Sequence, residues 1–284
     1  MITDNLRESN NVEDFRGGGN RPRFGMKHGI LGTIVMAVVV YFLGGNPLSV
    51  LHITNTTIQQ PAEQAELTVH QKEMTVFVSK ILASTEDVWG KLFKSIGTAY
   101  RQPKLVLFSG EISSACGYAQ AATGPFYCPG DEKVYLDLDF LESLQKQLGA
   151  EGDFAVAYII AHEVGHHVQK LLGIMDSMDQ LRASGTSQKK INEANVRLEL
   201  QADFLAGVWI NHGQEMQTFL EKGDLEEALN AATAVGDDKI QMETQGRVMP
   251  DSFTHGTSAQ RKHWLDKGIE TGDINQGGTF NSLE

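Results

Sequence analysis

The chain contains the pentapeptide His162-Glu163-Val164-Gly165-His166. Two histidines four positions apart on a helix lie about 40° apart around its axis and one turn along it, so both imidazoles can reach one metal ion. Glu163 follows the first histidine directly, where its carboxylate can take a proton from a water bound to that ion. The pentapeptide therefore predicts a metal centre on a helix.

The residues before the pentapeptide predict a buried helix from Asp153 to Leu172. Gly152 and Asp153 are typical of a helix start, and Gly173 is typical of a helix stop. Residues 154–161 are apolar almost all round, which indicates a central helix inside the domain. Histidines and a carboxylate at the end of such a run are costly to bury unless a metal ion pairs with them. The alternative is that they are ordinary polar residues where the helix emerges into solvent.

A catalytic zinc ion requires a third protein ligand besides the two histidines. A histidine six residues after the second is absent, because Leu172 stands there. Glu199 is the better candidate, on a helix predicted from Ile191 to Ile210 and closed by Gly213. Asp203 lies four residues after Glu199 on the same face. Glu199 can bind the metal while Asp203 accepts the free N–H of a ligand histidine.

The alternative interpretation of Glu199 and Asp203 is a solvated acidic face. Ala202 and Ala206 are small enough to let this helix approach the first one closely. His167 points about 100° away from the second ligand around the helix, which favours a packed or surface histidine. Three other residues compete for the place of the third ligand: His212, His255 and Glu193.

The pattern His162-Glu163-x-x-His166 followed by Glu199-x-x-x-Asp203 resembles the gluzincin metallopeptidases. A basic, glycine-rich N-terminus before a single apolar segment is similar to a narrower bacterial family, the neutral zinc metallopeptidases. Residues 199–203 and four further stretches carry the same resemblance: residues 114–117, 122–129, 133–137 and 253–256. With the N-terminal features, the resemblance covers nearly the whole chain.

The resemblance implies an α+β, zincin-like metallopeptidase domain, with a small sheet packed on the first zinc helix. It also implies an edge strand that binds peptide by strand addition. Residues 104–108 and 133–138 have the pattern of short strands, and one of them is expected to be that edge. The remaining helical patterns are two amphipathic stretches between about 66 and 97, one at 224–235 and one at 258–267.

The expected function is that of a membrane-anchored, zinc-dependent endopeptidase acting on a peptide or protein substrate. Zn²⁺ held by His162, His166 and Glu199 polarises a water, and Glu163 serves as the general base. Four residues compete for stabilising the oxyanion: His255, Tyr118, Tyr127 and Arg261. Two alternatives stay open. One is a catalytically silent zinc module that binds peptides or envelope partners, and the other is a zinc hydrolase of a non-peptide amide.

Residues 29–45 form an uncharged, strongly apolar run, and extension to residue 51 reaches the ~20 residues that a spanning helix needs. Basic residues precede this run, and no Lys or Arg follows it before Lys72, so the N-terminus is expected to stay cytoplasmic at the inner membrane. A cleaved signal peptide is the alternative, although no small-x-small cleavage site follows. The predicted organisation is a flexible cytoplasmic tail (1–28), a transmembrane helix (29–51), a linker (52–65) and an exported, periplasmic zinc metallopeptidase domain (66–284).

Charge and cysteine content agree with export. The net charge is −12, and the residues after 28 carry 19 basic against 32 acidic side chains, which gives no basic footprint for nucleic acid. In an oxidising compartment Cys116 and Cys128 are expected to form a disulfide, worth about 3 kcal/mol by chain-entropy reasoning. In the cytoplasm they would remain thiols.

Overall fold

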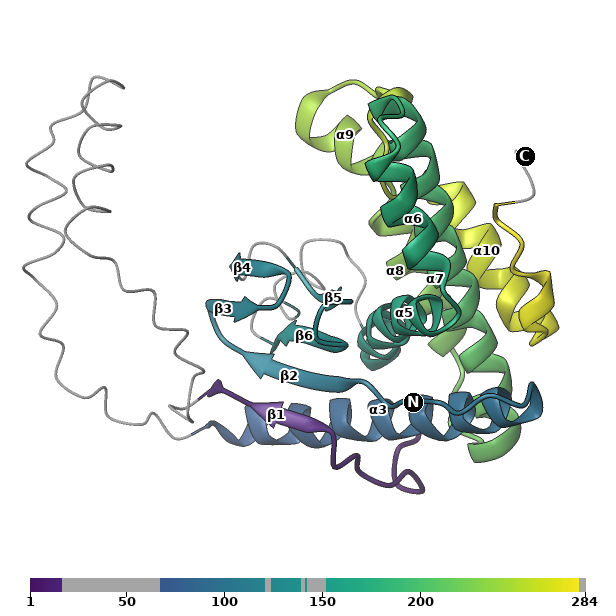
Figure 1. Ribbon diagram of the computed structural model, residues 1–284. Helices are drawn as coiled ribbons and strands as arrows, with labels where there is room; N and C mark the ends of the chain where they lie inside the picture. The colour runs from purple at the N-terminus through teal and green to yellow at the C-terminus, as the bar shows by residue number, and fades with distance from the viewer. Residues whose placement is uncertain (17–66, 121–123, 139–140, 142–151, 281–284) are drawn as a thin grey trace, which may run out of the picture. The chain divides into compact units, whose positions relative to one another are not determined.

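The computed structural model describes residues 1–16, 67–120, 124–138, 141 and 152–280. Met1–Asp14 and Thr68–Glu284 form one compact unit, whereas Phe15–Leu67 is a second unit that lies almost wholly outside the described residues. Figure 1 shows the first unit as a small sheet accompanied by a larger group of helices. The predicted α+β class is therefore confirmed.

The main sheet has the strand order β1–β2–β6–β5 within the described residues. The strands are β1 (Val12–Asp14), β2 (Lys104–Phe108), β6 (Lys133–Asp137) and β5 (Phe126–Cys128). β1 and β6 run parallel to β2, and β5 is antiparallel to β6. The two predicted strands are thus present as β2 and β6. The expectation that one of them is an edge is wrong, because β1 and β5 pair with their outer sides.

A hairpin of β3 (Glu111–Ser114) and β4 (Gly117–Gln120) lies between β2 and β5 in the chain. Gly117 follows the turn with a φ of 119°, a backbone conformation that favours glycine. A disulfide joins Cys116, in this turn, to Cys128 at the end of β5. The predicted disulfide is therefore present, and it ties the hairpin to the main sheet.

The first fourteen residues differ from the sequence-based expectation. The sequence predicts that they belong to a flexible tail (1–28), but in the structure they contain β1 and pack on the domain. The Asn11 carbonyl accepts the N–H of Leu105 at 2.8 Å, and Leu6 is buried. A short, charged strand carries no local signal of its own, because its pairing partner supplies the preference for the extended conformation.

A single helix, α3 (Val69–Ser95), replaces the two helical stretches expected between 66 and 97. Thr68 begins it with a capping box, in which Thr68 Oγ1 accepts the N–H of Gln71 and Gln71 Oε1 accepts the N–H of Thr68. The sequence between the two expected stretches contains no proline, so nothing in the backbone interrupts the helix. Its buried face packs against α5 and α7.

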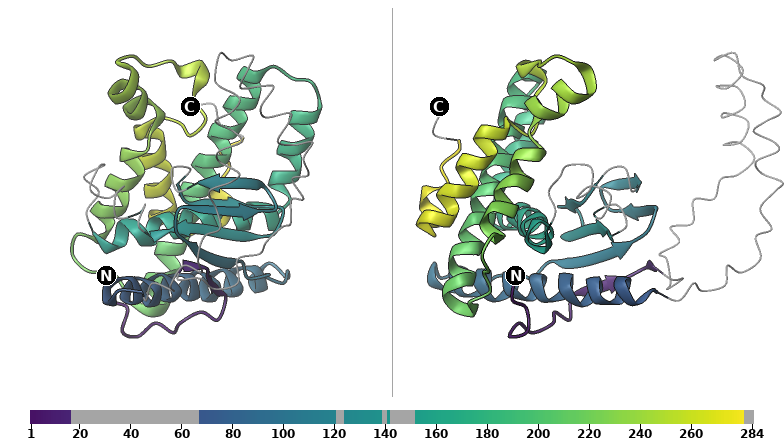
Figure 2. Two further views of the ribbon diagram at one scale, coloured as in Figure 1. Left: turned by 90° about the vertical axis from the view of Figure 1, so that its left-hand side faces the viewer. Right: turned by 180° about the vertical axis from the view of Figure 1, so that it is seen from behind.

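The remaining helices are α5 (Asp153–Leu171), α6 (Ile174–Ala183), α7 (Gln188–Gln217), α8 (Asp224–Ala234), α9 (Asp237–Gln245) and α10 (Ser258–Thr271). α7 contacts both α5 and α10, and the right-hand view of Figure 2 shows it between them. α5, α7, α8 and α10 agree with predicted helices, whereas α6 and α9 were not predicted. Gly213 does not end α7. It lies inside the helix, where a Cβ would stand 2.4 Å from the ring of Phe219.

Among the described helices, none is both long enough and apolar enough to cross a bilayer. The predicted transmembrane helix (29–51) and the predicted linker (52–65) lie outside the described residues. Both stay predictions.

Candidate metal centre

The candidate metal centre lies where α5 and α7 cross at small residues. A Cβ on Gly165 would lie 3.0 Å from the carbonyl oxygen of Ala202, so the two backbones are nearly in contact at this point. The expectation that Ala202 permits a close approach agrees with this geometry. Because the backbones meet here, side chains of α5 and α7 that lie within three residues of the contact can reach the same point in space.

His162, His166 and Glu199 converge at this crossing, and the ligand atoms that they offer all lie within 4.8 Å of one another. Glu199 Oε2 lies 3.2 Å from His162 Nε2, and Glu199 Oε1 lies 3.5 Å from His166 Nε2. Zinc bonds of about 2.0–2.1 Å at tetrahedral angles place neighbouring ligand atoms about 3.3 Å apart. The donor set and its spacing therefore fit Zn²⁺.

An ionic network holds His162. Its Nδ1 lies 2.9 Å from Asp203 Oδ1, which leaves Nε2 to face Glu199. Asp203 is fully buried and also accepts the hydroxyl of Tyr158 at 2.5 Å. Arg261 donates to both carboxylate oxygens of Asp203, through Nε at 2.8 Å and Nη2 at 2.9 Å. Such a bidentate pair fixes the carboxylate, and through it the orientation of the imidazole.

Burial and the ionic partners shift the pKa values of Asp203 and His162 in opposite directions. Burial raises the pKa of Asp203, but Arg261 and His162 lower it more strongly, to about 2. Burial lowers the pKa of His162, but Asp203 and Glu199 raise it to about 10. A cation at His162 Nε2 competes with the proton there, so binding of a metal should release a proton.

An uncharged network holds His166. Its Nδ1 lies 2.9 Å from Gln169 Oε1, so Nε2 again faces Glu199. Gln169 is fully buried, and its Nε2 donates to the carbonyl of Leu198 at 2.7 Å and to Gln201 Oε1 at 3.0 Å. Gln169 is not among the site residues that the sequence predicts. Its spacing of three residues from His166 on the same helix is the signal that identifies it.

Glu163 is 8% exposed and makes no hydrogen bond to the described residues. The rival third ligands do not join the cluster within the described residues. His212 donates to the carbonyl of Gly272 at 2.8 Å, and Glu193 lines a cavity of about 380 Å³ between α7 and α10. His255 pairs with Asp237 at 3.2 Å instead.

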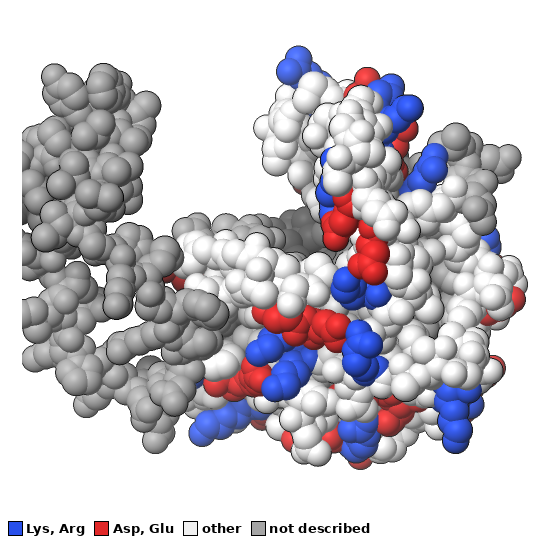
Figure 3. Space-filling view, viewed as in Figure 1, with Lys and Arg blue, Asp and Glu red and all other residues white. Residues whose placement is uncertain are grey.

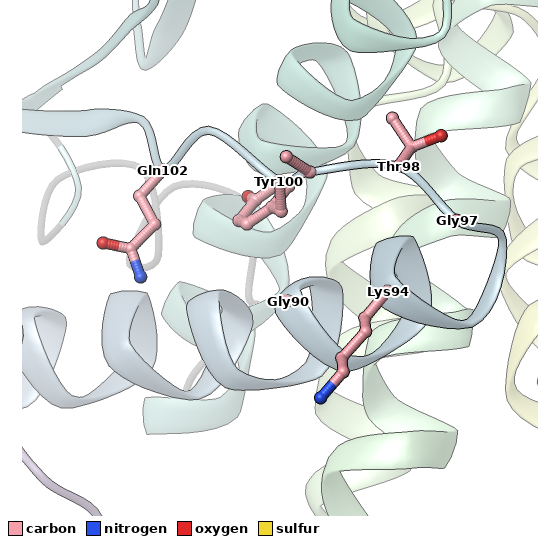
Figure 4. Close-up of a pocket in the computed structure, with 7 residues that line it drawn as sticks. Gly90, Lys94, Gly97, Thr98, Tyr100 and Gln102 are labelled. Carbon is pink, nitrogen blue, oxygen red and sulfur yellow. The ribbon is translucent and has the colours of Figure 1, made fainter.

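His167 is fully buried, as the packed interpretation predicts. Its Nε2 donates to the carbonyl of Arg101 at 2.6 Å, and its Nδ1 accepts the hydroxyl of Tyr127 at 3.0 Å. The ring of Tyr100 packs edge-on against it with centroids 5.7 Å apart. Tyr100 also lines a cavity of about 460 Å³ between α3 and the segment after it, which Figure 4 shows. His167 thus connects α5 to β5 and to the segment before β2.

The loop at 253–257 places His255 beside the metal centre. Gly256 in this loop has a φ of 92°, and a Cβ there would lie 3.2 Å from Val196 and 3.3 Å from Leu200. These two residues flank Glu199 on α7. The loop therefore packs directly on the turn of α7 that carries the proposed third ligand.

Asp237, at the start of α9, clamps this loop. Its Oδ2 accepts the N–H groups of Thr254, His255 and Gly256 at 2.7, 2.6 and 3.0 Å. Its Oδ1 lies 3.2 Å from His255 Nδ1. The hydrogen bond to Asp237 is the main reason why the pKa of His255 is raised, and Glu199 adds to it. The side chain of His255 is 51% exposed to solvent.

The other three residues considered for oxyanion stabilisation have different environments. Arg261 is 4% exposed and engaged with Asp203. The Tyr127 hydroxyl is bonded to His167. Tyr118 is 61% exposed on β4.

Comparison with known proteins identifies the family. Residues 1–280 match the sequence model of the family described as "Putative neutral zinc metallopeptidase". The chain is 48% identical over 282 residues to "Uncharacterized protein YpfJ" of Escherichia coli (strain K12), with 96% of each chain covered. It is 40% identical over 218 residues to "Uncharacterized protein Rv2575" of Mycobacterium tuberculosis (strain ATCC 25618 / H37Rv), which covers 73% of this chain and 72% of that one. No solved structure matches the chain significantly. The chain thus belongs to the family of putative neutral zinc metallopeptidases.

Proposed function

We propose that this chain is a zinc-dependent endopeptidase that hydrolyses peptide bonds in a peptide or protein substrate. One observation carries the proposal: the Nε2 atoms of His162 and His166 both face the carboxylate of Glu199. The opposite ring nitrogens are already engaged by Asp203 and Gln169. Each histidine therefore has one nitrogen left for a cation, and the two nitrogens point to the same place.

In this proposal His162, His166 and Glu199 hold the ion. When bound, Zn²⁺ supplies Lewis-acid polarisation of the scissile carbonyl and lowers the pKa of water toward 7. Glu163 accepts a proton from the attacking water and delivers it to the leaving amine. Its freedom from hydrogen bonds to the described residues leaves the carboxylate available for both transfers.

His255 is the residue that we assign to the carbonyl oxygen as negative charge develops on it. Asp237 engages Nδ1, so Nε2–H is the donor that remains. The raised pKa keeps the imidazolium protonated to higher pH than a free histidine. Arg261 supports the centre differently in this proposal, because its guanidinium positions Asp203.

β5 is the strand that we assign to recognition of the substrate backbone. It is an outer strand of the described sheet and antiparallel to β6. The hydrogen bond between Tyr127 and His167 fixes β5 to α5, next to the second metal-binding histidine. An extended peptide that pairs with β5 would therefore pass close to the metal centre.

The disulfide favours an oxidising compartment for the domain. We therefore propose that the domain is exported and faces the periplasm. Association of residues 29–51 with the inner membrane is part of the same proposal.

The test uses the purified full chain and its Glu163→Gln variant, each incubated with a mixed peptide library and assayed for bound zinc by mass spectrometry. Glu163→Gln should keep one zinc ion and lose about 10²–10⁴-fold in cleavage rate. Glu243→Gln, at an exposed position on α9, serves as the matched control and should cleave like the parent. Zinc binding without peptide cleavage by the parent would overturn the proposal. A binding module would then be indicated, or a hydrolase of other amides if such a substrate is cleaved.

A further inference from the structure

The N-terminal segment, residues 1–14, satisfies a buried charge of the domain. Glu86 lies within α3 and is 2% exposed. Its carboxylate accepts hydrogen bonds from Arg7 Nη2 at 2.7 Å, Ser9 Oγ at 2.6 Å and Asn11 Nδ2 at 2.7 Å. Among the described residues, every hydrogen bond that the Glu86 side chain accepts comes from the N-terminal segment. Removal of the segment would leave a buried carboxylate unpaired, which is strongly unfavourable.

The segment also completes the sheet. β1 pairs with β2 in parallel, with Val12 opposite Leu105 and Asp14 opposite Leu107. Without β1, the N–H and C=O groups along that side of β2 would form an unpaired edge. Glu13 adds an ionic bridge across two strands, to Lys104 Nζ at 2.5 Å and to Lys133 Nζ at 2.6 Å. Figure 3 shows acidic and basic side chains interspersed over the sheet and α3.

Further hydrogen bonds and the burial of Leu6 extend the interface between the N-terminal segment and α3. Ser9 N–H donates to Ser79 Oγ at 3.0 Å, and Ser79 Oγ donates to the Ser9 carbonyl at 3.2 Å. Arg7 Nη2 donates to Asp87 Oδ1 at 2.7 Å, and Leu6 is 6% exposed. The family match begins at residue 1, so the segment lies inside the matched region together with the metal centre. The segment is therefore an integral part of the domain.

We propose that residues 1–14 and 68–284 lie on the same side of any membrane that the apolar run at 29–45 enters. A single crossing by that run would place the two parts on opposite sides of the bilayer and remove the partners of Glu86 and of β2. The sequence-based expectation, with residues 1–28 cytoplasmic and the domain exported, requires such a crossing. That expectation rests on the basic residues beside the apolar run. The pairing of residues 12–14 with β2 does not enter into it.

Two cysteine reporters in the full-length chain test this arrangement. Glu8→Cys and Glu243→Cys both lie at exposed positions, one in each part of the domain. Each variant is expressed in a Gram-negative bacterium and treated with a membrane-impermeant maleimide before and after lysis. The unsubstituted chain gives the background. Both reporters should react alike, either both before lysis or both only after it. Reaction of one reporter before lysis and of the other only after it would overturn the proposal.

A second measurement tests the packing itself. Glu13→Lys and Glu8→Lys change the net charge equally, but only the first places a third cation against Lys104 and Lys133. In the full chain, Glu13→Lys should lower the midpoint of thermal unfolding by about 2–4 °C more than Glu8→Lys does. Equal midpoints would show that the segment is not packed on the domain, and the proposal would fail.

Discussion

The two histidines of the candidate metal centre are held by neighbours of opposite chemical kind, one charged and one neutral. His162 donates to Asp203, which is itself paired with Arg261. His166 donates to the neutral amide of Gln169. Both supports are buried, and both leave Nε2 facing the same carboxylate. The comparison shows that either a charged carboxylate or a neutral amide can orient a histidine side chain. The two supports differ in the free energy of unfolding that is lost when one of them is disrupted.

The ionic support is balanced as long as both partners are present. Arg261 compensates the charge of Asp203, so His162 gains a strong acceptor without a net charge being added beside Glu199. If one partner is removed, the other becomes a buried unpaired charge, which costs about 3–5 kcal/mol. Loss of the amide at Gln169 would leave uncharged groups unpaired, which would lower the free energy of unfolding by about 1–3 kcal/mol.

The largest effect is therefore expected for Asp203→Ala. In the metal-free full chain, this change should lower the free energy of unfolding by about 3–5 kcal/mol, because it leaves Arg261 buried and unpaired. It should also weaken zinc binding about 10–100-fold, because His162 loses the acceptor that fixes its ring. Urea unfolding after chelation measures the first quantity, and competition titration with a zinc-binding dye measures the second.

The double variant Asp203→Ala, Arg261→Met separates the two contributions. It should recover part of the lost stability, since no buried charge is left unpaired, while zinc binding should remain weak. A cost of less than about 1 kcal/mol for Asp203→Ala, or no recovery in the double variant, would contradict the ionic interpretation of this support.

A smaller effect is expected for Gln169→Met, which keeps the volume of the side chain but removes its amide. The His166 N–H and the Leu198 carbonyl then lose their partner, at about 1–3 kcal/mol of unfolding free energy. Zinc affinity should fall about tenfold. The same two titrations measure both changes. If Gln169→Met cost as much as Asp203→Ala, charge would not be what distinguishes the two supports.

Part of this centre could be predicted from sequence because helix geometry is local. His162 and His166 share a face through their spacing of four residues, and so do Glu199 and Asp203. The partners that orient these residues depend on which helices pack together. Arg261 comes from α10, and its contact with Asp203 follows from the packing of α10 on α7. No periodicity in either segment carries that information.

The same holds for the fold: elements with a local sequence pattern could be predicted, and elements that depend on a distant partner could not. β2 and β6 are apolar enough to be recognised as strands, whereas β1 is the tripeptide Val12–Asp14, with two acidic residues. Its strand conformation comes from pairing with β2, because each residue of β1 pairs with one that lies 93 positions later in the chain. The prediction that Gly213 ends α7 is wrong for a related reason. A glycine in a helical pattern suggests an end, but here it makes room for Phe219, which follows the helix and folds back on it.

A second imidazole–carboxylate support, between His255 and Asp237, extends the comparison because its histidine is half exposed. It repeats the chemistry of the contact between His162 and Asp203, but the His255 side chain is 51% exposed. Solvent screens such a pair, so Asp237→Asn should change the free energy of unfolding by no more than about 1 kcal/mol through this contact. If the loss equalled that of Asp203→Ala, burial would not set the size of the effect.

The same substitution should nevertheless change the pH dependence of cleavage. The hydrogen bond to Asp237 raises the pKa of His255, so its removal lowers that pKa. In our proposal the protonated imidazole stabilises the oxyanion, and activity is lost as the pH rises through the pKa of His255. Asp237→Asn should therefore move the alkaline limb of the kcat/KM profile to lower pH and leave the acid limb in place. His255→Gln should remove the alkaline limb that belongs to this residue and reduce kcat/KM about 10²–10³-fold. An alkaline limb that stays in place in both variants would mean that another group titrates there. His255 would then not be the residue that stabilises the oxyanion.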